Sequence, residues 1–291
     1  MAFLEHIPES WISRRRATKS EVAGTGWAPF AGQLSHASRN HAVIIVAGLF
    51  EWLTAASYLR SNPWILVNRQ TGDDRARNEL DTRAFTPEAW ASLLGFAEAQ
   101  APSPARSRTR FLLKFLEATG LRASELLTAT TGDLRRRRGH WVLQVHGKGS
   151  RNRLVVVPRQ AEEALNDYLF TRQLPELGQG TEVAPLPDAT PLVASVRDHM
   201  APVGYQTLYE STKSWFRRAI VASDLGAQEK ADALRASLHW LRHTCGTRAL
   251  ERGVSLEVVQ EQLGHKDPRT TMRYAKAQLE RRQEELGKAF G

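Results

Sequence analysis

The sequence predicts a mainly α-helical protein with one small antiparallel β-sheet, an α+β fold arranged in two domains. Three observations predict this class. Most apolar residues recur every three or four positions, which is the period of a helix. In residues 141–146, side chains instead alternate with the period of a strand, and an apolar run follows at residues 154–157. The length of 291 residues suits two domains of roughly 100 to 200 residues each.

The N-terminal part is expected to form a small helical domain. Its clearest helix spans residues 36–56, where apolar side chains follow helical spacing. The polar residues 68–83 indicate a linker, so a domain boundary is expected inside them. We therefore predict one domain over residues 1–75 and a second over residues 81–291.

The second domain is expected to begin with consecutive helices. Thr86 is a suitable N-cap, and Pro87 occupies the first helical position, where a missing N–H is tolerated. A second helix is expected over residues 110–120, with Gly120 as its C-terminal stop. A third helix is expected to begin at once in residues 121–127.

A β-hairpin is expected after these helices, because residues 141–145 alternate and residues 154–158 form an apolar run. The turn between them is rich in glycine and carries Lys148. Residues 174–191 are rich in proline and glycine and indicate a long surface loop. Helical patterns return from Tyr205 onward.

The charge balance indicates a polyanionic partner. Lys and Arg number 40 against 31 Asp and Glu, so the net charge is +9 and the sequence pI is about 10.0. Nucleic acid is the first candidate. The single cysteine, Cys245, excludes an intramolecular disulfide and fits a cytoplasmic setting. The longest apolar run, residues 42–50, is half the length of a membrane span, so we expect no membrane segment and no signal peptide.

His239, Arg242 and His243 lie close together in the sequence and share helical spacing. Two histidines four residues apart can bind zinc, but Arg242 beside His243 would repel a cation, so we expect no metal site. His239 and Arg242 are three apart and suit a phosphate group. Taken alone, the pair is better explained by a surface arginine next to a packed histidine.

Four segments together resemble the tyrosine recombinases, the phage integrase family. They read TGLRASEL, HGKGSRNRLVVVP, HWLRHTCGTRAL and LGHKDPRTTMRYA, and they occur in that family's order. The resemblance covers residues 86–276, and residues 34–63 are similar to the family's helical core-binding domain. It implies a core-binding domain, incomplete at its N-terminus, followed by a tyrosine recombinase catalytic domain.

The resemblance implies the catalytic residues Arg122, Lys148, His239, Arg242, His265 and Tyr274. Arg122 and Arg242, with His265, would donate hydrogen bonds to the phosphate oxygens on which negative charge builds. Glu125 would help to orient the site. Without the resemblance, Glu125 is equally explained by a local ion pair with Arg122.

The remaining implied roles concern the nucleophile and the protons. Tyr274 would attack the DNA phosphate, and its phenol, with an unperturbed pKa of about 10, needs a proton acceptor. His239 would accept that proton, and Lys148 would protonate the leaving 5′ oxygen. The product would be a 3′-phosphotyrosine, formed without metal, ATP or any other cofactor. Outside the resemblance, Lys148 is explained as a solvated turn residue and His265 as a helix cap.

Further basic side chains are expected to contact DNA: Arg39, Arg135, Arg136, Arg151, Arg153 and Arg269. For the arginine run over residues 135–138, a solvated hairpin end is the simpler explanation. Residues 277–290 form an amphipathic pattern. The resemblance implies that such a segment docks on a neighbouring protomer, and packing on its own domain is the alternative.

The resemblance implies a site-specific recombinase, or integrase, of bacterial or phage origin. It would act on double-stranded DNA as a homo-oligomer, a tetramer when two duplexes are paired. One alternative is a type IB topoisomerase-like enzyme, against which the small N-terminal domain and short C-terminal tail count. Another is a DNA-binding regulator without catalysis, against which the intact set of six residues counts.

Overall fold

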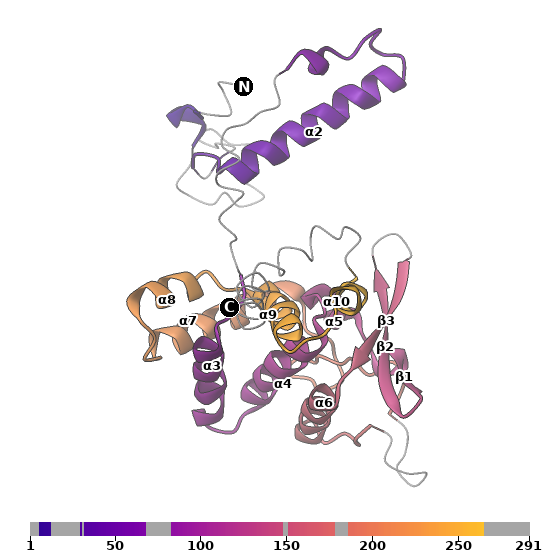
Figure 1. The fold of residues 1–291 in the computed structure, drawn as a ribbon, viewed down its shortest axis with the longest axis vertical. Helices are drawn as coiled ribbons and strands as arrows, with labels where there is room; N and C mark the ends of the chain where they lie inside the picture. Colours follow the sequence, from indigo (N-terminus) through magenta and orange to yellow (C-terminus); the bar gives the residue numbers. More distant parts are fainter. Residues whose placement is uncertain are drawn as a thin grey trace, which may run out of the picture. The chain divides into compact units, whose positions relative to one another are not determined.

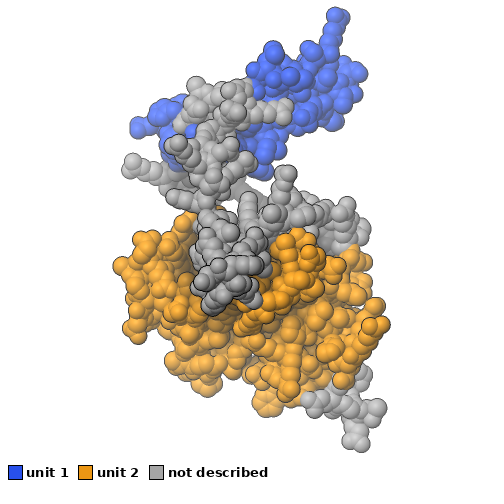
Figure 2. Space-filling view, viewed as in Figure 1, with its two compact units in different colours: residues 1–80 blue, residues 81–291 orange. Residues whose placement is uncertain are grey.

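The computed structural model describes residues 6–12, 30, 32–67, 83–147, 151–177 and 186–264. The chain divides into two compact units, residues 1–80 and 81–291 (Figure 2). The described residues are mainly helical and contain one three-stranded antiparallel sheet, which confirms the predicted fold class.

The first unit contains the helix that the apolar spacing predicts. Helix α2 spans His36–Ala55, and its N-cap Ser35 accepts a hydrogen bond from the backbone N–H of Ser38. Two short 3-10 helices, η1 (Glu9–Trp11) and η2 (Pro63–Leu66), complete the described elements of this unit.

The second unit contains the other helices and all three strands (Figure 1). Its described helices are α3 (Pro87–Ala99), α4 (Pro104–Thr119), α5 (Ala123–Thr128), α6 (Arg159–Thr171), α7 (Tyr205–Val221), α8 (Ala227–Ala233), α9 (Leu238–Glu251) and α10 (Leu256–Leu263), with the 3-10 turn η4 (Thr131–Asp133). Its strands are β1 (Leu134–Arg137), β2 (His140–Gly147) and β3 (Arg151–Val157).

The helix ends follow from the residues that were expected to set them. The hydroxyl of Thr86 accepts from the N–H of Ala89, and α3 begins at Pro87 as predicted. Helix α4 ends at Gly120, whose φ of 66° is left-handed and favours glycine. Its start lies six residues earlier than the sequence indicated, because Ser103 caps it through the N–H of Arg106.

The sheet has the order β1-β2-β3, and the predicted β2–β3 hairpin is present. Strand β1 was not predicted, because only Leu134 of its four residues is buried and the strand therefore shows no alternation. The arginine run forms β1 and the turn into β2, where Arg138 and Gly139 have φ angles of 50° and 84°. Helix α6, directly after the sheet, was also not predicted.

Helix α4 lies in the core of the second unit, against α6, α9 and β3 (Figure 1). Phe111, Phe115 and Leu116 on this helix are at most 1% exposed. The ring of Phe111 stacks on Tyr168 of α6 with 4.8 Å between centroids. This packing fixes the C-terminal end of α4, which leads directly into the predicted site. No helix among the described residues is long and apolar enough to cross a membrane.

Candidate functional site

Arg242 lies at the junction of three helices. It belongs to α9 and is 1% exposed. Its Nη1 donates to the carbonyl of Gly120 at 2.7 Å, and its Nη2 donates to the carbonyl of Leu263. These carbonyls lie at the C-terminal ends of α4 and α10, where a helix leaves its carbonyls without partners. One guanidinium therefore joins both helix ends and places its positive charge beside their carbonyl groups.

Arg122 lies two residues after Gly120, whose carbonyl accepts the hydrogen bond from Arg242. It precedes α5, and its side chain is 43% exposed. Its Nη1 donates to Oε1 of Glu125 at 2.8 Å, and its backbone N–H donates to Oε2 at 2.8 Å. The predicted local ion pair is therefore present, and it holds Arg122 at the start of α5.

Glu125 also binds a second arginine, which comes from the sheet. Arg153 on β3 donates from Nη1 to Oε1 and from Nη2 to Oε2, both at 2.8 Å. Desolvation by burial acts to raise the pKa of Glu125, but the hydrogen bonds from Arg153 and Arg122 outweigh it and lower the pKa to about 2. The carboxylate is therefore charged at neutral pH and shared by two guanidiniums.

His239 lies one helical turn before Arg242 on α9 and is exposed on the described surface. Desolvation lowers its pKa below the ordinary 6.5, and the positive charges of Arg242, Arg122 and Arg83 lower it further. The imidazole is consequently neutral at pH 7 and able to accept a proton. Its ring lies perpendicular to that of His243, with centroids 4.6 Å apart.

The structure thus brings together four of the residues that the sequence singled out: Arg122, Glu125, His239 and Arg242. Both guanidiniums act on the same imidazole, although the sequence separates the two arginines by more than a hundred residues. Lys148, His265 and Tyr274 lie outside the described residues. Among the described residues, no group of three or more His, Cys, Asp or Glu side chains has the arrangement of a metal site.

The side chains expected to contact DNA have different surroundings. Arg135 and Arg136 are exposed on β1, and Arg135 donates to the backbone carbonyls of Gly132 and Leu134. Arg39 lies on α2 and is partly buried. The side chain of Arg151 and all of Arg269 lie outside the described residues.

Two features of the site were not visible in the sequence. Arg83, in the segment before α3, is close enough to His239 to affect its pKa. Arg153 binds Glu125 across 28 residues of sequence, and no local spacing indicates that pair. The sequence showed only that Arg153 belongs to a basic segment around the hairpin. That observation predicted a contact with DNA and not the observed contact with Glu125.

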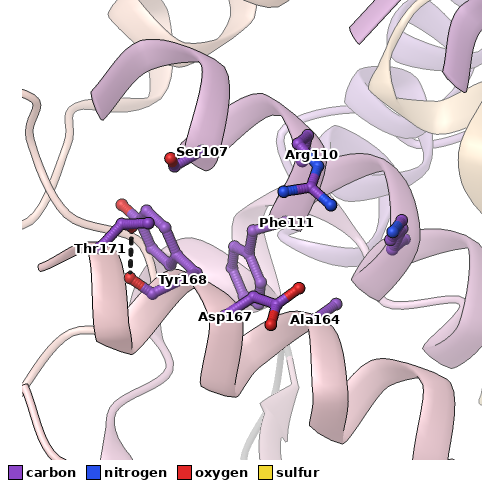
Figure 3. Close-up of a pocket in the computed structure, with 8 residues that line it drawn as sticks. Ser107, Arg110, Phe111, Ala164, Asp167, Tyr168 and Thr171 are labelled. Atoms are coloured by element: carbon purple, nitrogen blue, oxygen red, sulfur yellow. Dashed lines mark hydrogen bonds between the residues drawn. The ribbon is translucent and has the colours of Figure 1, made fainter. Parts of the chain in front are cut away.

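A small pocket lies away from these residues, between α4 and α6 (Figure 3). The side chains that line it are Ser107, Arg110, Phe111, Lys114, Ala164, Asp167, Tyr168 and Thr171. Arg110 is paired with Glu98 at 2.8 Å. None of the predicted site residues lines this pocket.

Comparison with known proteins connects this arrangement to a large group of enzymes. The sequence pattern of the phage integrase family matches residues 83–281. "Tyrosine recombinase XerC" of Pelobacter propionicus is 33% identical over 184 residues, which are 62% of this chain and 52% of that protein. "Tyrosine recombinase XerD" of Agrobacterium fabrum is 34% identical over 204 residues, 66% of this chain and 57% of that protein. The chain therefore matches little more than half the length of these relatives.

Solved structures share the fold. The XerH site-specific recombinase bound to a palindromic difH substrate, a post-cleavage complex, matches with a TM-score of 0.62 and 22% identity over 86% of this chain and 67% of that one. The Tn1549 transposon integrase with transposon right-end DNA matches with a TM-score of 0.58 and 17% identity, over 85% of this chain and 80% of that one. At 22% and 17% identity, the two matches show a shared fold.

Proposed function

This chain belongs to the phage integrase family, and from that premise we propose that it is a site-specific DNA recombinase that cuts and rejoins strands through a 3′-phosphotyrosine. The observation that carries the proposal is that Arg242 binds the carbonyl of Gly120, two residues before Arg122, and that the positive charges of both arginines lower the pKa of His239. Two guanidiniums beside a proton acceptor suit the attack of a hydroxyl on a phosphodiester.

In this proposal, Arg122 and Arg242 donate hydrogen bonds to the non-bridging oxygens of the scissile phosphate, and His265 adds another. Such preset donors stabilise the charge that builds in the transition state, and removing one typically costs about 3 to 4 kcal/mol. Glu125 supports the role of Arg122, because it holds both the backbone and the side chain of that residue.

Tyr274 is the proposed nucleophile. Its phenolic proton passes to His239, whose lowered pKa keeps the imidazole neutral and ready to accept it. The phenolate oxygen forms a bond to phosphorus as the bond to the 5′ oxygen breaks, and Lys148 supplies the proton to that leaving oxygen. The phosphotyrosine keeps the energy of the broken bond, so another 5′ hydroxyl can rejoin the strand without ATP.

The proposal assigns the two units to different tasks on double-stranded DNA. Residues 1–75 would form the core-binding domain and residues 81–291 the catalytic domain. Four copies would assemble when two duplexes are paired, because each copy supplies one nucleophile and the exchange cuts four strands. The named relatives are bacterial, which supports a bacterial setting.

A nicked suicide duplex tests the proposal. The site sequence is obtained by selecting a random-sequence DNA pool for binding to the full-length protein, and the selected duplex is then made with a nick near the expected cleavage point. Loss of the short fragment beside the nick prevents rejoining, so we expect a covalent protein–DNA adduct on a denaturing gel. The adduct should disappear in Tyr274→Phe.

The outcomes separate the proposed recombinase from the two alternatives. Binding without any adduct would indicate a regulator and contradict the proposal. Relaxation of arbitrary plasmid by monomeric protein would indicate a type IB topoisomerase-like enzyme. An adduct that survives in Tyr274→Phe would show that another side chain is the nucleophile.

A further inference from the structure

We propose that Arg153 is a positioning residue for DNA cleavage, which connects the catalytic Arg122 to the backbone that leads to His265. This inference rests on the proposed function and deepens it. It also replaces the expectation that Arg153 contacts the DNA backbone.

Both terminal nitrogens of Arg153 bind Glu125. The two bonds are 2.8 Å long and form a fork on a carboxylate that is 8% exposed, while the Arg153 side chain is 18% exposed. A paired fork of this kind fixes the orientation of both partners. The same Oε1 accepts from Nη1 of Arg122. A displacement of Arg153 therefore moves the acceptor that holds Arg122.

Arg153 also contacts the C-terminal end of α10. Gly264 has a left-handed φ of 66°, and a methyl group built on it would lie 2.7 Å from both Cδ and Nε of Arg153. The backbone of Gly264 thus packs directly on the arginine side chain, and only glycine leaves room for it. On the preceding residue, the carbonyl of Leu263 accepts from Arg242.

The Nε atom of Arg153, which packs against Gly264, is buried. This atom has no hydrogen-bond partner among the residues that the structure describes. A buried N–H without a partner is costly, so the two bonds to Glu125 must hold the Arg153 side chain in this position against that cost.

Arg153 lies near the start of β3, close to the hairpin turn. Arg151 lies two residues earlier and pairs with Gly147 of β2, and the turn between them carries Lys148. Arg153 therefore contacts Glu125 and Gly264 from a strand that follows the turn with the proposed acid, Lys148.

Single-turnover cleavage of the selected nicked duplex tests this role. The variants are Arg153→Gln and Arg153→Lys, since lysine keeps the charge but lacks the fork. We expect cleavage at saturating DNA to slow by about 100-fold in both, the effect of displacing reacting groups by about 1 Å. The dissociation constant and its salt dependence should stay within about twofold, because a lost phosphate contact would change the salt slope by about 0.9.

The double variant Glu125→Gln/Arg153→Gln tests whether Arg153 acts through Glu125. If both residues act through the same contact, the double variant should cleave about as slowly as the slower single variant. Arg159→Gln on α6 is the matched control, since Arg159 is also paired with a glutamate, at 2.8 Å, but its side chain is 91% exposed. It should cleave at the wild-type rate.

Each outcome decides the inference. Equal cleavage by wild type and both Arg153 variants would overturn it and leave the proposed function intact. Weaker binding with a smaller salt slope and unchanged cleavage would show a phosphate contact instead. Multiplicative effects in the double variant would show that Arg153 and Glu125 act separately. No adduct from the wild type would remove the reaction itself and overturn both proposals.

Discussion

Glu125 accepts four hydrogen bonds, one from the backbone of Arg122 and three from guanidinium nitrogens of Arg122 and Arg153. A buried carboxylate is costly unless it is satisfied in this way. Because the two partners come from different elements, the residue contributes to stability as well as to the geometry of the site.

The first prediction concerns Glu125→Gln and acid stability. The folded-state pKa of about 2 lies below the ordinary value of 4.5, so the charged carboxylate stabilises the fold above pH 4.5 and this contribution is lost as pH falls toward 2. The variant should lose about 3 kcal/mol of unfolding free energy at pH 7. Urea denaturation at pH 7 and pH 3 measures it, and a difference from wild type that does not shrink at pH 3 would contradict the prediction.

The second prediction concerns His239 and the pH dependence of cleavage. Only the neutral imidazole accepts a proton, and its pKa is lowered by desolvation and by the charges of Arg242, Arg122 and Arg83. Single-turnover cleavage should therefore stay high on lowering the pH to 6.5 and fall only below it. Arg83→Gln removes one of these charges, so the acid limb should move to higher pH. An unchanged limb would show that His239 is not the titrating base.

At the scale of elements, the ends of helices were easier to predict than strands with one buried residue. Thr86, Pro87 and Gly120 act locally, through capping bonds and a left-handed φ, so their effect is visible in a short window of sequence. Strand β1 is defined by its pairing with β2, since three of its four side chains are exposed. Local pattern cannot show such a strand.

The third prediction compares two glycines with similar backbone angles. Gly120 has a φ of 66°, and an added methyl group would lie 2.3 Å from Cδ2 of Leu263 and 3.0 Å from Sγ of Cys245. Gly139 has a φ of 84°, and a methyl group added there would have no atom within 4 Å among the described residues. Gly139→Ala should cost only the left-handed strain of about 1 kcal/mol, and Gly120→Ala at least about 2 kcal/mol more.

Chemical denaturation of both glycine variants gives the comparison. Equal losses of unfolding free energy in the two variants would mean that α10 can move away from Gly120 at little cost in free energy. Because Arg242 binds the carbonyls of Gly120 and Leu263, the larger loss in Gly120→Ala should be accompanied by slower DNA cleavage.

At the scale of the whole molecule, the sequence was sufficient for the fold class. Arg122, His239 and Arg242 were singled out through the resemblance, and their catalytic roles stay a prediction; the structure shows that the charges of both arginines lower the pKa of His239. The fork between Arg153 and Glu125 could not be predicted, because it depends on how β3 packs against the start of α5. Judged by charge alone, Arg153 could not be distinguished from the neighbouring arginines that were expected to contact DNA.

The fourth prediction concerns the two units. The buried residues of the second unit form a large apolar core, so residues 81–291 should fold without the first unit. We expect its melting temperature to stay within about 4 °C of that of the full chain. DNA affinity should fall, because the basic residues of the first unit are lost. Calorimetry and DNA titration check both, and a broad transition would show that the units depend on each other.

Gln262 on α10 has a consequence for how this protein behaves at high concentration. Strand β3 is an outer strand of the sheet, beside α10 (Figure 1), and the Gln262 amide accepts from the N–H of Val156 and donates to its carbonyl, at 3.0 and 2.9 Å. An extended segment of another molecule would have to displace this amide to add to the sheet at that point. The Gln262 side chain thereby hinders aggregation through pairing of β3 with a strand of another molecule.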